Sequence, residues 1–387
     1  MSPPEPLAIM LSAGEASGDL HGSTLCRAIA RAEPGARLLG MGGARMAAAG
    51  MRVLADPTAH AVAGISDAAG GIPALYRTYR SLVGCLHRER PAALVLVDFP
   101  EFNLRLARQA RRAGVPVVYF VPPQLWAWRR GRLRPMARRV NRVLAVLPFE
   151  EDLYAGAGVP VTFVGHPLLD VLPLDLTRVE ARRRLGLDQS EAVVGLLPGS
   201  RRAEVTRLLP AMAEAARRVA ASGAARRFVL ALAPTIDRAL VESLVRDSAR
   251  PGSPRVTVVS DRTYEVMAAA DAVLVASGTA TLESALIGVP MVICYRGSRL
   301  TEVVVRCLAR VPWCGLPNLI AGRAVVPEIL QDEVTGERLA TELRRLLEDP
   351  VAATTQRTAF KDIRGRLGEP GVGDRAARAV LQVARGA

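Results

Sequence analysis

The sequence predicts an α/β protein made of two Rossmann-like domains with a ligand-binding cleft between them. At 387 residues the chain is longer than a single hydrophobic core comfortably supports. Half of the residues are hydrophobic, which is typical of a globular protein. Short apolar runs alternate with amphipathic stretches along the whole chain, and this alternation indicates βαβ units with parallel sheets.

The expected strands fall into two sets of five, one in each half of the chain. The first set covers residues 7–11, 94–97, 115–121, 143–146 and 161–164, and the second covers residues 193–197, 228–233, 256–259, 272–275 and 291–295. Closely spaced structure-breaking residues follow the first set, at residues 166–175. We therefore expect one domain over residues 1–170, a second over 171–350 and a helical tail over 351–387. Ligands of open α/β sheets lie beyond the carboxyl ends of the strands, so site residues are expected in the loops that follow strands.

The net charge and the aromatic content of the chain limit the classes of molecule that it is expected to bind. The formal net charge is +14, and Lys361 is the only lysine, so nearly all the positive charge is arginine. Such a chain attracts polyanions: nucleic acid, anionic lipid headgroups or phosphorylated substrates. Only 4% of residues are aromatic and they are not interleaved with basic residues, which argues against a nucleic-acid partner. No apolar run approaches the roughly 18 residues of a membrane span, and no export signal is evident, so a cytoplasmic location is expected.

The cysteines give little support to metal chemistry. There are five, and their spacing fits neither zinc ligation nor a full disulfide framework. We expect buried free thiols and no metal site.

The stretch "SAGEASGD", residues 12–19, lies between an expected strand and an expected helix. A glycine-rich turn in this place usually binds phosphate, but this one carries two carboxylates, Glu15 and Asp19, which would repel a phosphate. We therefore expect Glu15 to face a sugar, with Ser17 shaping the turn. The alternative is that both carboxylates only accept hydrogen bonds from helix N–H groups.

Two loops of the second half are better suited to an anion. In "LLPGSRRAEV", residues 196–205, Gly199 permits close backbone approach, Ser200 can cap a helix and Arg201 can fork onto an anionic oxygen. The alternative is an ordinary capped turn. Neither this loop nor the next contains a P-loop or GxGxxG fingerprint, which favours a nucleotide-sugar over a nucleotide that is hydrolysed.

The second loop is "ASGTATLESALIGVP", residues 276–290. Ser277, Gly278 and Thr279 lead directly into a helix whose first N–H groups and dipole favour a pyrophosphate. Glu283 can accept hydrogen bonds from the two hydroxyls of a ribose. Its alternative role is to stabilise the helix N-terminus.

Two basic, amphipathic stretches are candidates for an acceptor-binding or membrane-facing surface. Residues 70–90 place Leu75, Tyr79 and Leu82 at helical spacing among arginines. Residues 126–142 contain seven arginines and two tryptophans, and the candidate contacts there are Trp126, Trp128, Arg129 and Arg130. The alternatives are a packed core helix for the first stretch and a solvated basic face for the second.

The motifs taken together are specific. They are "AGEASGD" at 13–19, "GMGG" at 40–43, "VDFPEFN" at 97–103, "WAWRRGR" at 126–132, "LPFE" at 147–150, "GHPLLD" at 165–170, "LLPGSRRAEV" at 196–205, "ASGTATLE" at 276–283 and "LPNLIAGR" at 316–323. In these residues the chain resembles the bacterial lipid-A-disaccharide synthases, which are inverting glycosyltransferases of the two-domain GT-B architecture. Among the few departures, His21 stands where the family leads us to expect an aliphatic residue.

The resemblance implies a reaction and a location. UDP-2,3-diacylglucosamine would donate its sugar to the 6-hydroxyl of 2,3-diacylglucosamine 1-phosphate, giving a β-1,6-linked disaccharide and UDP in lipid A biosynthesis. Because both substrates are anionic lipids, peripheral association with the cytoplasmic side of the inner membrane is expected. The resemblance also implies a homodimer in which C-terminal parts are exchanged.

Roles follow for individual residues. Asp98, at the end of an expected strand, is the candidate general base, and its alternative role is to cap the next helix. The leaving UDP would be held by Ser200, Arg201 and the amides around Gly278 and Thr279 in place of a divalent cation, so metal independence is expected and no cofactor is needed.

Further residues are expected to support the site. Asn318 is expected to contact the donor, and Glu15 to act toward the acceptor as a further catalytic residue. Glu328 is expected to support the surface or the site.

Two other functions fit parts of the pattern. A UDP-N-acetylglucosamine 2-epimerase shares the fold and the UDP-sugar chemistry but needs no lipid acceptor. A nucleic-acid-binding protein would account for the arginine excess and would bind DNA without binding UDP.

Overall fold

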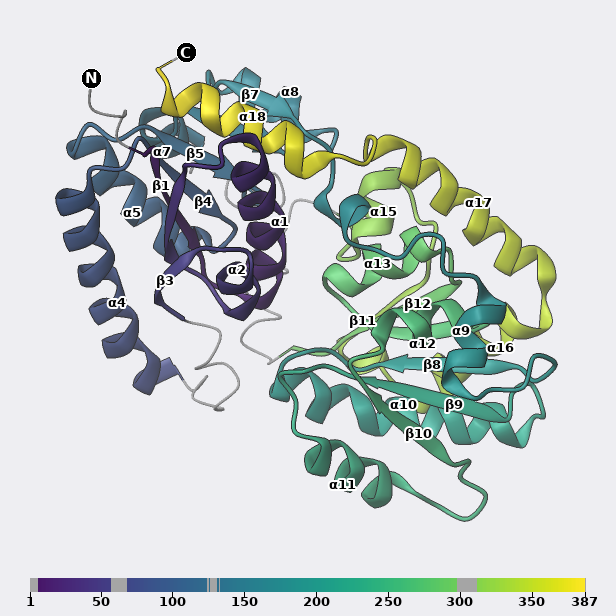
Figure 1. Cartoon of the computed structure of the whole chain (residues 1–387). Coiled ribbons are helices and arrows are strands. Elements are labelled where there is room, and N and C mark those ends of the chain that lie inside the picture. The colour runs from purple at the N-terminus through teal and green to yellow at the C-terminus, as the bar shows by residue number, and fades with distance from the viewer. Residues whose placement is uncertain are drawn as a thin grey trace. The chain divides into compact units, whose positions relative to one another are not determined.

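The chain folds into two compact α/β units, each with one parallel sheet between layers of helices (Figure 1). The computed structural model describes residues 6–56, 68–123, 125, 131, 133–297 and 312–386. The first unit comprises Met1–Val171 with Leu367–Ala387, and the second comprises Leu172–Arg366. The division therefore falls one residue after the expected end of the first domain. The expected tail, residues 351–387, is largely helical but is shared between the two units.

The first unit holds a seven-stranded parallel sheet in the order β3-β2-β1-β4-β5-β6-β7. Its strands are β1 Ala8–Ala13, β2 Arg37–Met41, β3 Arg52–Ala55, β4 Ala93–Val97, β5 Val117–Phe120, β6 Arg142–Ala145 and β7 Val161–Phe163. Its helices are α1 Ala16–Ala32, α2 Ala44–Ala48, α4 Ala68–Glu89, α5 Pro100–Arg112, α7 Leu133–Arg139, α8 Glu150–Gly156, the 3-10 turn η2 Pro167–Asp170 and α18 Val372–Ala384.

The second unit holds a six-stranded parallel sheet in the order β10-β9-β8-β11-β12-β13. Its strands are β8 Val193–Leu197, β9 Arg227–Leu232, β10 Val256–Ser260, β11 Ala272–Ala276, β12 Met291–Tyr295 and β13 Glu328–Leu330. Its helices are α9 Arg178–Leu185, α10 Arg202–Ala221, α11 Arg238–Ser248, α12 Thr263–Ala269, α13 Thr279–Ile287, α15 Leu316–Ala321, the 3-10 turn η3 Gln331–Glu333, α16 Gly336–Glu348 and α17 Pro350–Arg366.

The ten expected strands are all present, and three further strands were not expected. These are β2, β3 and β13. At the edge of the sheet, β3 has one exposed and three partly buried residues, and β13 has only three residues. Neither strand gives the long apolar run that marks a buried strand.

In each sheet, the direction in which the chain adds new strands reverses at one pair of neighbouring strands, which we call the switch point. The chain begins each sheet in the middle, at β1 and β8, builds outward to one side, and then crosses to β4 and β11 on the other side. In doubly wound sheets the ligand lies beyond the carboxyl ends of such a pair, because the crossover helices diverge there. The four loops after β1, β4, β8 and β11 are therefore the expected places for site residues.

Helix α5 shows how the sequence builds the first core. Pro100 begins the helix, and Phe102, Leu106 and Ala110 recur at helical spacing and are buried against the sheet. Arg105 and its neighbours on the opposite side of the helix are exposed. Burial of these side chains stabilises the unit through the hydrophobic effect, and the same period sorts the arginines onto one outer face.

Arg182 in α9 is a fully buried arginine whose hydrogen bonds connect α9 with α12, with the loop before β8 and with Asp271. Its Nε donates to the carbonyl oxygen of Ala269 at 3.0 Å, and Nη2 donates to Oδ2 of Asp271 at 2.8 Å. Nη1 donates to three carbonyl oxygens in residues 188–191 at 2.8–3.0 Å. A buried cation is tolerated only with such a complete set of acceptors.

Replacing Arg182 by Met will therefore destabilise the second unit by about 3–5 kcal/mol, because the carbonyl oxygens lose this donor and Asp271 loses one of its partners. Urea denaturation followed by circular dichroism measures this effect. The matched control is Arg183→Ala, which removes an exposed arginine paired with Glu180 on the same helix and should leave the midpoint close to that of the wild type. Equal midpoints for the two variants would contradict the assigned role.

Candidate functional site

The loops after β1 and β4 are neighbours in the first unit. Strands β1 and β4 are paired in parallel, with Ala13 opposite Val97. Gly14 and Glu15 follow Ala13, and Asp98 follows Val97, so the two predicted catalytic carboxylates leave the same edge of the sheet from adjacent strands. Both residues are half-buried. The register thus brings Glu15 and Asp98 to the switch point of the sheet.

The two loops also pack against each other. A Cβ atom on Gly14 would lie 2.2 Å from Cδ1 of Phe99, so only glycine leaves room for this ring. The Phe99 ring in turn stacks on Phe102 of α5, with ring centroids 5.6 Å apart. The carboxylate loop therefore rests on a rigid aromatic base.

Asp98 and Phe99 form a strained turn at the end of β4. Their φ angles are +49° and +48°, in the left-handed region that costs about 1–2 kcal/mol for each residue other than glycine. Such strain is typical of functional sites, where the surrounding structure holds a side chain in one orientation.

Glu15 and Asp19 have different surroundings. Glu15 occupies the N-cap position of α1 in an extended conformation, without capping that helix through its side chain. Asp19 is buried and accepts hydrogen bonds from the backbone N–H groups of Gly43, Arg45 and Met46 at 2.8–3.1 Å. Asp19 therefore stabilises the N-terminus of α2, which is the structural alternative considered for it. Ser17 is half-buried in the first turn of α1.

The predicted anion loops are neighbours in the second unit. Strand β8 pairs with β11, with Leu197 opposite Val275. Gly199 and Ser200 follow β8, and Ser277 and Gly278 follow β11, so both loops leave the same edge of that sheet. The switch point of the second unit is thus lined by N–H groups, hydroxyls and arginine where that of the first unit carries carboxylates.

Arg201 occupies the N-cap position of α10, and its side chain extends into solvent. Its side chain is 67% exposed, and Nη1 lies 3.6 Å from Oε1 of Glu204 in the first turn. A long, exposed ion pair of this kind contributes little stability. Arg201 can therefore exchange its carboxylate partner for a phosphate at small cost.

Both glycines of these loops have conformations that side chains disfavour. The φ angles are +113° at Gly199 and +146° at Gly278. Gly278 is exposed at the N-terminus of α13, and Thr279 begins that helix. Glu283 lies about one turn further along and is half-buried. The backbone N–H groups at the start of α13 are thus open to close approach by an anion.

Thr235 is a residue of this site that the sequence did not suggest. Its Oγ1 donates a hydrogen bond of 2.6 Å to the carbonyl oxygen of Ser200. Thr235 follows β9, the neighbour of β8, so its position after a strand is the one signal that could have identified it. It holds the loop of Gly199 and Ser200 in place.

The structure corrects the prediction for Asn318. Its side chain is 1% exposed, and Oδ1 accepts from the N–H groups of Val325 and Val326 at 2.7 and 3.0 Å. Nδ2 donates to the carbonyl oxygen of Val326 and to Oε1 of Glu328. These four bonds use the whole capacity of the amide, so the side chain has no group left for a donor.

Glu328 supports the same segment. Its carboxylate accepts from the N–H groups of Cys314 and Gly315 at 2.8 and 3.0 Å, just before α15. The carbonyl oxygen of Cys314 lies 3.4 Å from Oγ of Ser277, so this segment borders the loop after β11. Asn318 and Glu328 thus shape the backbone beside the predicted donor loop.

The prediction for α4 is partly wrong. Leu82 is fully buried in the core of the first unit, so it cannot face a membrane or an acceptor. Tyr79 is half-buried; its ring contacts Phe102 edge-on, with centroids 5.8 Å apart, and its hydroxyl accepts from Nε2 of Gln109 at 3.2 Å. Leu75 is 38% exposed and remains available to a partner.

The remaining candidates of this surface, Trp126, Trp128, Arg129 and Arg130, lie outside the described residues. Within the described ranges, no helix combines the length and the apolar character needed to cross a bilayer.

The described cysteines do not have the lowered pKa that is typical of reactive thiols. Cys26, Cys85 and Cys294 are buried, and burial raises the pKa of Cys26 and of Cys294 to about 12. Cys314 is exposed by area, yet desolvation and the neighbouring Glu328 carboxylate raise its pKa. Cys307 lies outside the described residues. The part of the chain that the structure describes contains no group of three or more His, Cys, Asp or Glu residues placed to hold a metal ion.

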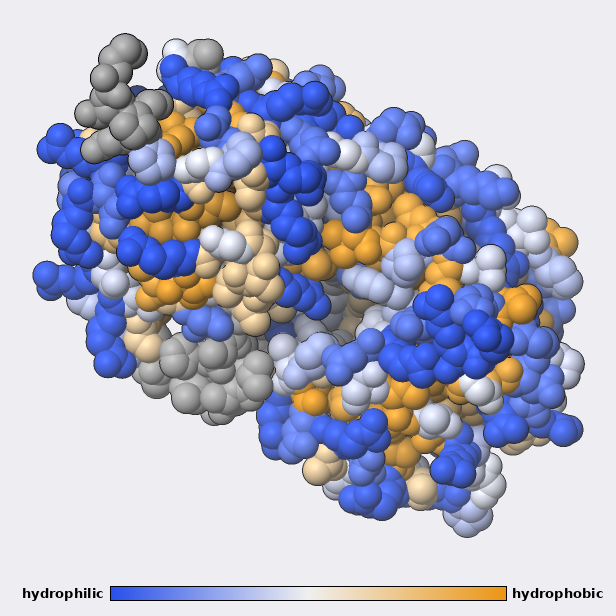
Figure 2. Space-filling view, in the orientation of Figure 1, coloured by the Kyte–Doolittle hydropathy of each residue, from blue (hydrophilic) through white to orange (hydrophobic). Residues whose placement is uncertain are grey.

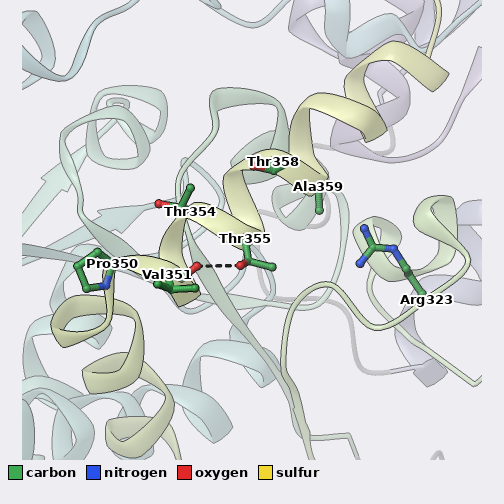
Figure 3. A pocket seen from close by; sticks show the side chains of 7 residues that line it. All are labelled: Arg323, Pro350, Val351, Thr354, Thr355, Thr358 and Ala359. Carbon is green, nitrogen blue, oxygen red and sulfur yellow. Dashed lines mark hydrogen bonds between the residues drawn. The ribbon is translucent and has the colours of Figure 1, made fainter.

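A cavity of about 450 Å³ lies on the second unit, and none of the predicted site residues lines it (Figure 3). It is lined by one face of α17 and by Arg323 after α15; the lining residues are Arg323, Pro350, Val351, Thr354, Thr355, Thr358 and Ala359. Oγ1 of Thr355 donates to the carbonyl oxygen of Val351 at 2.8 Å. None of these residues follows a strand of the switch point.

A buried histidine pair lies behind the loop of the first unit. His21 of α1 and His166, just before η2, meet edge-on with ring centroids 6.0 Å apart. Burial lowers the pKa of His21 to about 4, and the Arg45 charge adds to this effect. Burial, and then the neighbouring His21, lower the pKa of His166 to about 3. Nδ1 of His21 finds no hydrogen-bond partner among the described residues.

His21→Leu should therefore stabilise the first unit and flatten its pH dependence. An unfolded histidine titrates near 6.5, so neutral burial contributes stability that is present above about pH 6.5 and is lost as the pH falls toward 4. Each buried histidine then costs about 1.4 kcal/mol per pH unit in that window. The loss between pH 7 and 5 should shrink by about 2 kcal/mol in His21→Leu.

Thermal unfolding at pH 7 and pH 5 measures this difference. The matched control is His87→Gln, which removes an exposed histidine of α4 in the same unit. A variant His21→Leu that loses as much stability as the wild type would show that His21 does not cause the loss.

Comparison with known proteins identifies the family of this chain. A profile of the family described as lipid-A-disaccharide synthetase matches residues 9–381. The chain belongs to the lipid-A-disaccharide synthase family. It is 44% identical over 378 residues to the synthase of Myxococcus xanthus, covering 98% of each chain. It is 43% identical over 375 residues to that of Geobacter metallireducens, covering 97% of each. The chain is thus a glycosyltransferase of lipid A biosynthesis, as the motifs predicted.

Solved structures of other proteins share the fold. The UDP-GlcNAc 2-epimerase from Neisseria meningitidis bound to UDP-GlcNAc has a TM-score of 0.62 at 11% identity, over 98% of this chain and 100% of that chain. A UDP-glucosyltransferase from Polygonum tinctorium has a TM-score of 0.64 at 15% identity, over 100% of both chains. These likenesses confirm the two-domain GT-B fold.

Proposed function

We propose that this member of the lipid-A-disaccharide synthase family transfers 2,3-diacylglucosamine from UDP-2,3-diacylglucosamine to the 6-hydroxyl of 2,3-diacylglucosamine 1-phosphate. The products are the β-1,6-linked disaccharide and UDP. The observation that carries the proposal is the contrast between the two switch points. Carboxylates follow β1 and β4 in the first unit, whereas an arginine, hydroxyls and a helix N-terminus follow β8 and β11 in the second.

The proposed reaction is one displacement. Asp98 accepts the proton of the acceptor 6-hydroxyl while that oxygen attacks the anomeric carbon of the donor sugar. The bond between the anomeric carbon and the phosphate oxygen breaks, and its electron pair leaves with UDP. The configuration inverts, and no covalent enzyme intermediate forms.

The second unit stabilises the leaving group in this proposal. Negative charge develops on the diphosphate, and Arg201 and the N–H groups at the start of α13 supply the compensating positive potential. Ser200 and Thr279 add hydroxyl donors, and Glu283 accepts from the ribose hydroxyls. These groups take the place of a divalent cation, so we propose that the reaction is independent of metal.

Glu15 serves the acceptor in this proposal. Its loop carries a carboxylate that would repel the diphosphate, so it suits a sugar, whose hydroxyls donate to it. Ser17 lies in the next turn and helps to shape that loop.

We also propose that the enzyme associates peripherally with the cytoplasmic face of the inner membrane through the outer face of α4, α5 and α7. The exposed arginines of these three helices are Arg77, Arg80, Arg88, Arg105, Arg108, Arg111, Arg112, Arg134 and Arg138. The three helices pack side by side on one side of the sheet (Figure 1). Hydrophilic residues line that edge of the first unit in Figure 2. Such a face suits anionic headgroups, at about 1 kcal/mol for each arginine near the surface.

Substituting Arg105, Arg108 and Arg112 together by alanine should weaken binding to phosphatidylglycerol vesicles by about 100-fold, measured by co-sedimentation. The matched control removes the same charge from the second unit at Arg183, Arg217 and Arg344, which pair with glutamates in their own helices. Equal losses, or wild-type binding that does not weaken with salt, would contradict this surface. Stronger binding to DNA than to vesicles would favour the nucleic-acid alternative.

The proposed homodimer with exchanged C-terminal parts is tested by light scattering coupled to size exclusion. In the chain described here, α18 packs on α1 within the first unit. A molar mass of one chain, about 41 kDa, would contradict a dimer.

The reaction itself is tested by incubating the enzyme with the UDP-diacylglucosamine donor and its 1-phosphate acceptor, with mass detection of the products. Disaccharide and UDP are expected in equal amounts, with and without EDTA. Conversion of UDP-N-acetylglucosamine to its 2-epimer without an acceptor would favour the epimerase alternative. Loss of product in EDTA, restored by added metal, would contradict metal independence.

A further inference from the structure

The turn that carries Asp98 is held from behind by a buried polar cluster. Asn103 and Tyr119 are fully buried, as is Ser12 of β1. Nδ2 of Asn103 and the hydroxyl of Tyr119 each donate to the carbonyl oxygen of Asp98 at 2.7 Å. This one carbonyl therefore receives two short hydrogen bonds, from α5 and from the neighbouring strand β5.

Asn103 also joins the ends of the two switch-point strands. Its Nδ2 lies 3.2 Å from the carbonyl oxygens of Ser12 and Val97, in β1 and β4. Its Oδ1 accepts from Oγ of Ser12 at 2.7 Å. A single side-chain amide thus spans β1, β4 and the Asp98 turn, because it offers a donor group and an acceptor oxygen together.

The hydrogen bonds of this cluster hold a turn whose left-handed backbone is strained. Asp98 and Phe99 have φ angles of +49° and +48°, which neither residue prefers when unconstrained. If the donors to the Asp98 carbonyl are lost, the turn is free to relax toward ordinary backbone angles. Rotation about φ and ψ carries the carboxylate with it, since the Cα–Cβ bond is fixed to the backbone.

We propose that Asn103 and Tyr119 are positioning residues for Asp98: they hold its backbone carbonyl, and thereby keep its carboxylate aimed at the acceptor hydroxyl. The inference depends on the role proposed above for Asp98 as the base. Both residues act through Asp98, since their hydrogen bonds reach its main chain.

Misalignment of a general base lowers the rate of the chemical step more than the binding of substrates. Asn103→Ala should therefore lower kcat by about 10- to 100-fold, with the KM for the UDP donor changed by at most about twofold. Tyr119→Phe keeps the ring in the core and removes one of the two donors. It should lower kcat by about 3- to 10-fold.

The matched control is Tyr154→Phe. Tyr154 is equally buried in the same unit, and its hydroxyl likewise donates to a carbonyl oxygen, that of Pro123, at 2.9 Å. If Tyr119→Phe lowers kcat no more than Tyr154→Phe does, the loss reflects general packing and the inference is overturned. This comparison remains decisive even if Asn103→Ala fails to fold.

A double-mutant cycle gives the sharpest readout. In the Asp98→Asn background, adding Tyr119→Phe or Asn103→Ala should cause no further loss of kcat, because the carboxylate that they position is already absent. Losses that multiply would show that the residues act independently of Asp98. If Asp98→Asn alone retains normal turnover, the proposed base is wrong. If it abolishes turnover while Tyr119→Phe and Asn103→Ala have no effect, only the positioning role fails.

Discussion

Asp98→Asn will lower kcat by about 10²- to 10⁴-fold while UDP binding stays close to that of the wild type. Asparagine has the shape of aspartate but cannot accept the proton of the acceptor hydroxyl. It also tolerates the left-handed backbone of this position, where φ is +49°. Alanine would add backbone strain to the loss of the base, so Asp98→Asn is the cleaner substitution.

Steady-state assays at saturating donor and acceptor measure this effect. The matched control is Asp152→Asn, the same chemical change at an exposed position of α8 in the same unit. It should leave kcat unchanged. Near-normal turnover by folded Asp98→Asn would remove Asp98 from the mechanism and direct attention to Glu15, the carboxylate in the loop after the adjacent strand β1.

Arg201→Ala will lower kcat/KM by about 10²- to 10³-fold, because the developing charge on the diphosphate loses its arginine. The ion pair of this side chain with Glu204 is long and exposed, so losing that pair should cost the second unit little stability. Arg201→Lys keeps the charge without the two-pronged geometry and should fall between alanine and the wild type.

Arg207→Ala is the matched control for this prediction, since Arg207 is an exposed arginine on the same helix α10. It should bind UDP and turn over as the wild type does. A weakening of UDP binding that is equal in Arg207→Ala and Arg201→Ala would mean that overall charge, and not the Arg201 guanidinium, attracts the donor.

The sequence was sufficient for the strands that form the two switch points, but not for β2, although four of its five residues are buried. All strands of the two switch points, β1, β4, β8 and β11, were predicted, because buried parallel strands form continuous apolar runs. The short edge strands β3 and β13 were missed, because their residues alone bury too little apolar surface to stand out.

The loops of the site were predictable from their place after strands, but the environment of single side chains was not. Asn318 is saturated by partners up to ten residues away along the chain, and Leu82 packs into a core formed by other elements. An amphipathic helix such as α4 has the same periodicity whether its apolar side meets a sheet or a membrane. Asn103 and Thr235 were missed for the same reason, since their partners Ser12 and Ser200 are 91 and 35 residues away.

The central claim is a division of labour, in which the second unit holds the diphosphate and the carboxylates of the first unit serve the acceptor. The most direct test is calorimetric titration of UDP into the double variant Glu15→Gln/Asp98→Asn, with Arg201→Ala alongside. The claim predicts that the double variant binds UDP within about twofold of the wild type, whereas Arg201→Ala binds at least about tenfold more weakly. A double variant that loses UDP affinity as severely as Arg201→Ala would contradict it.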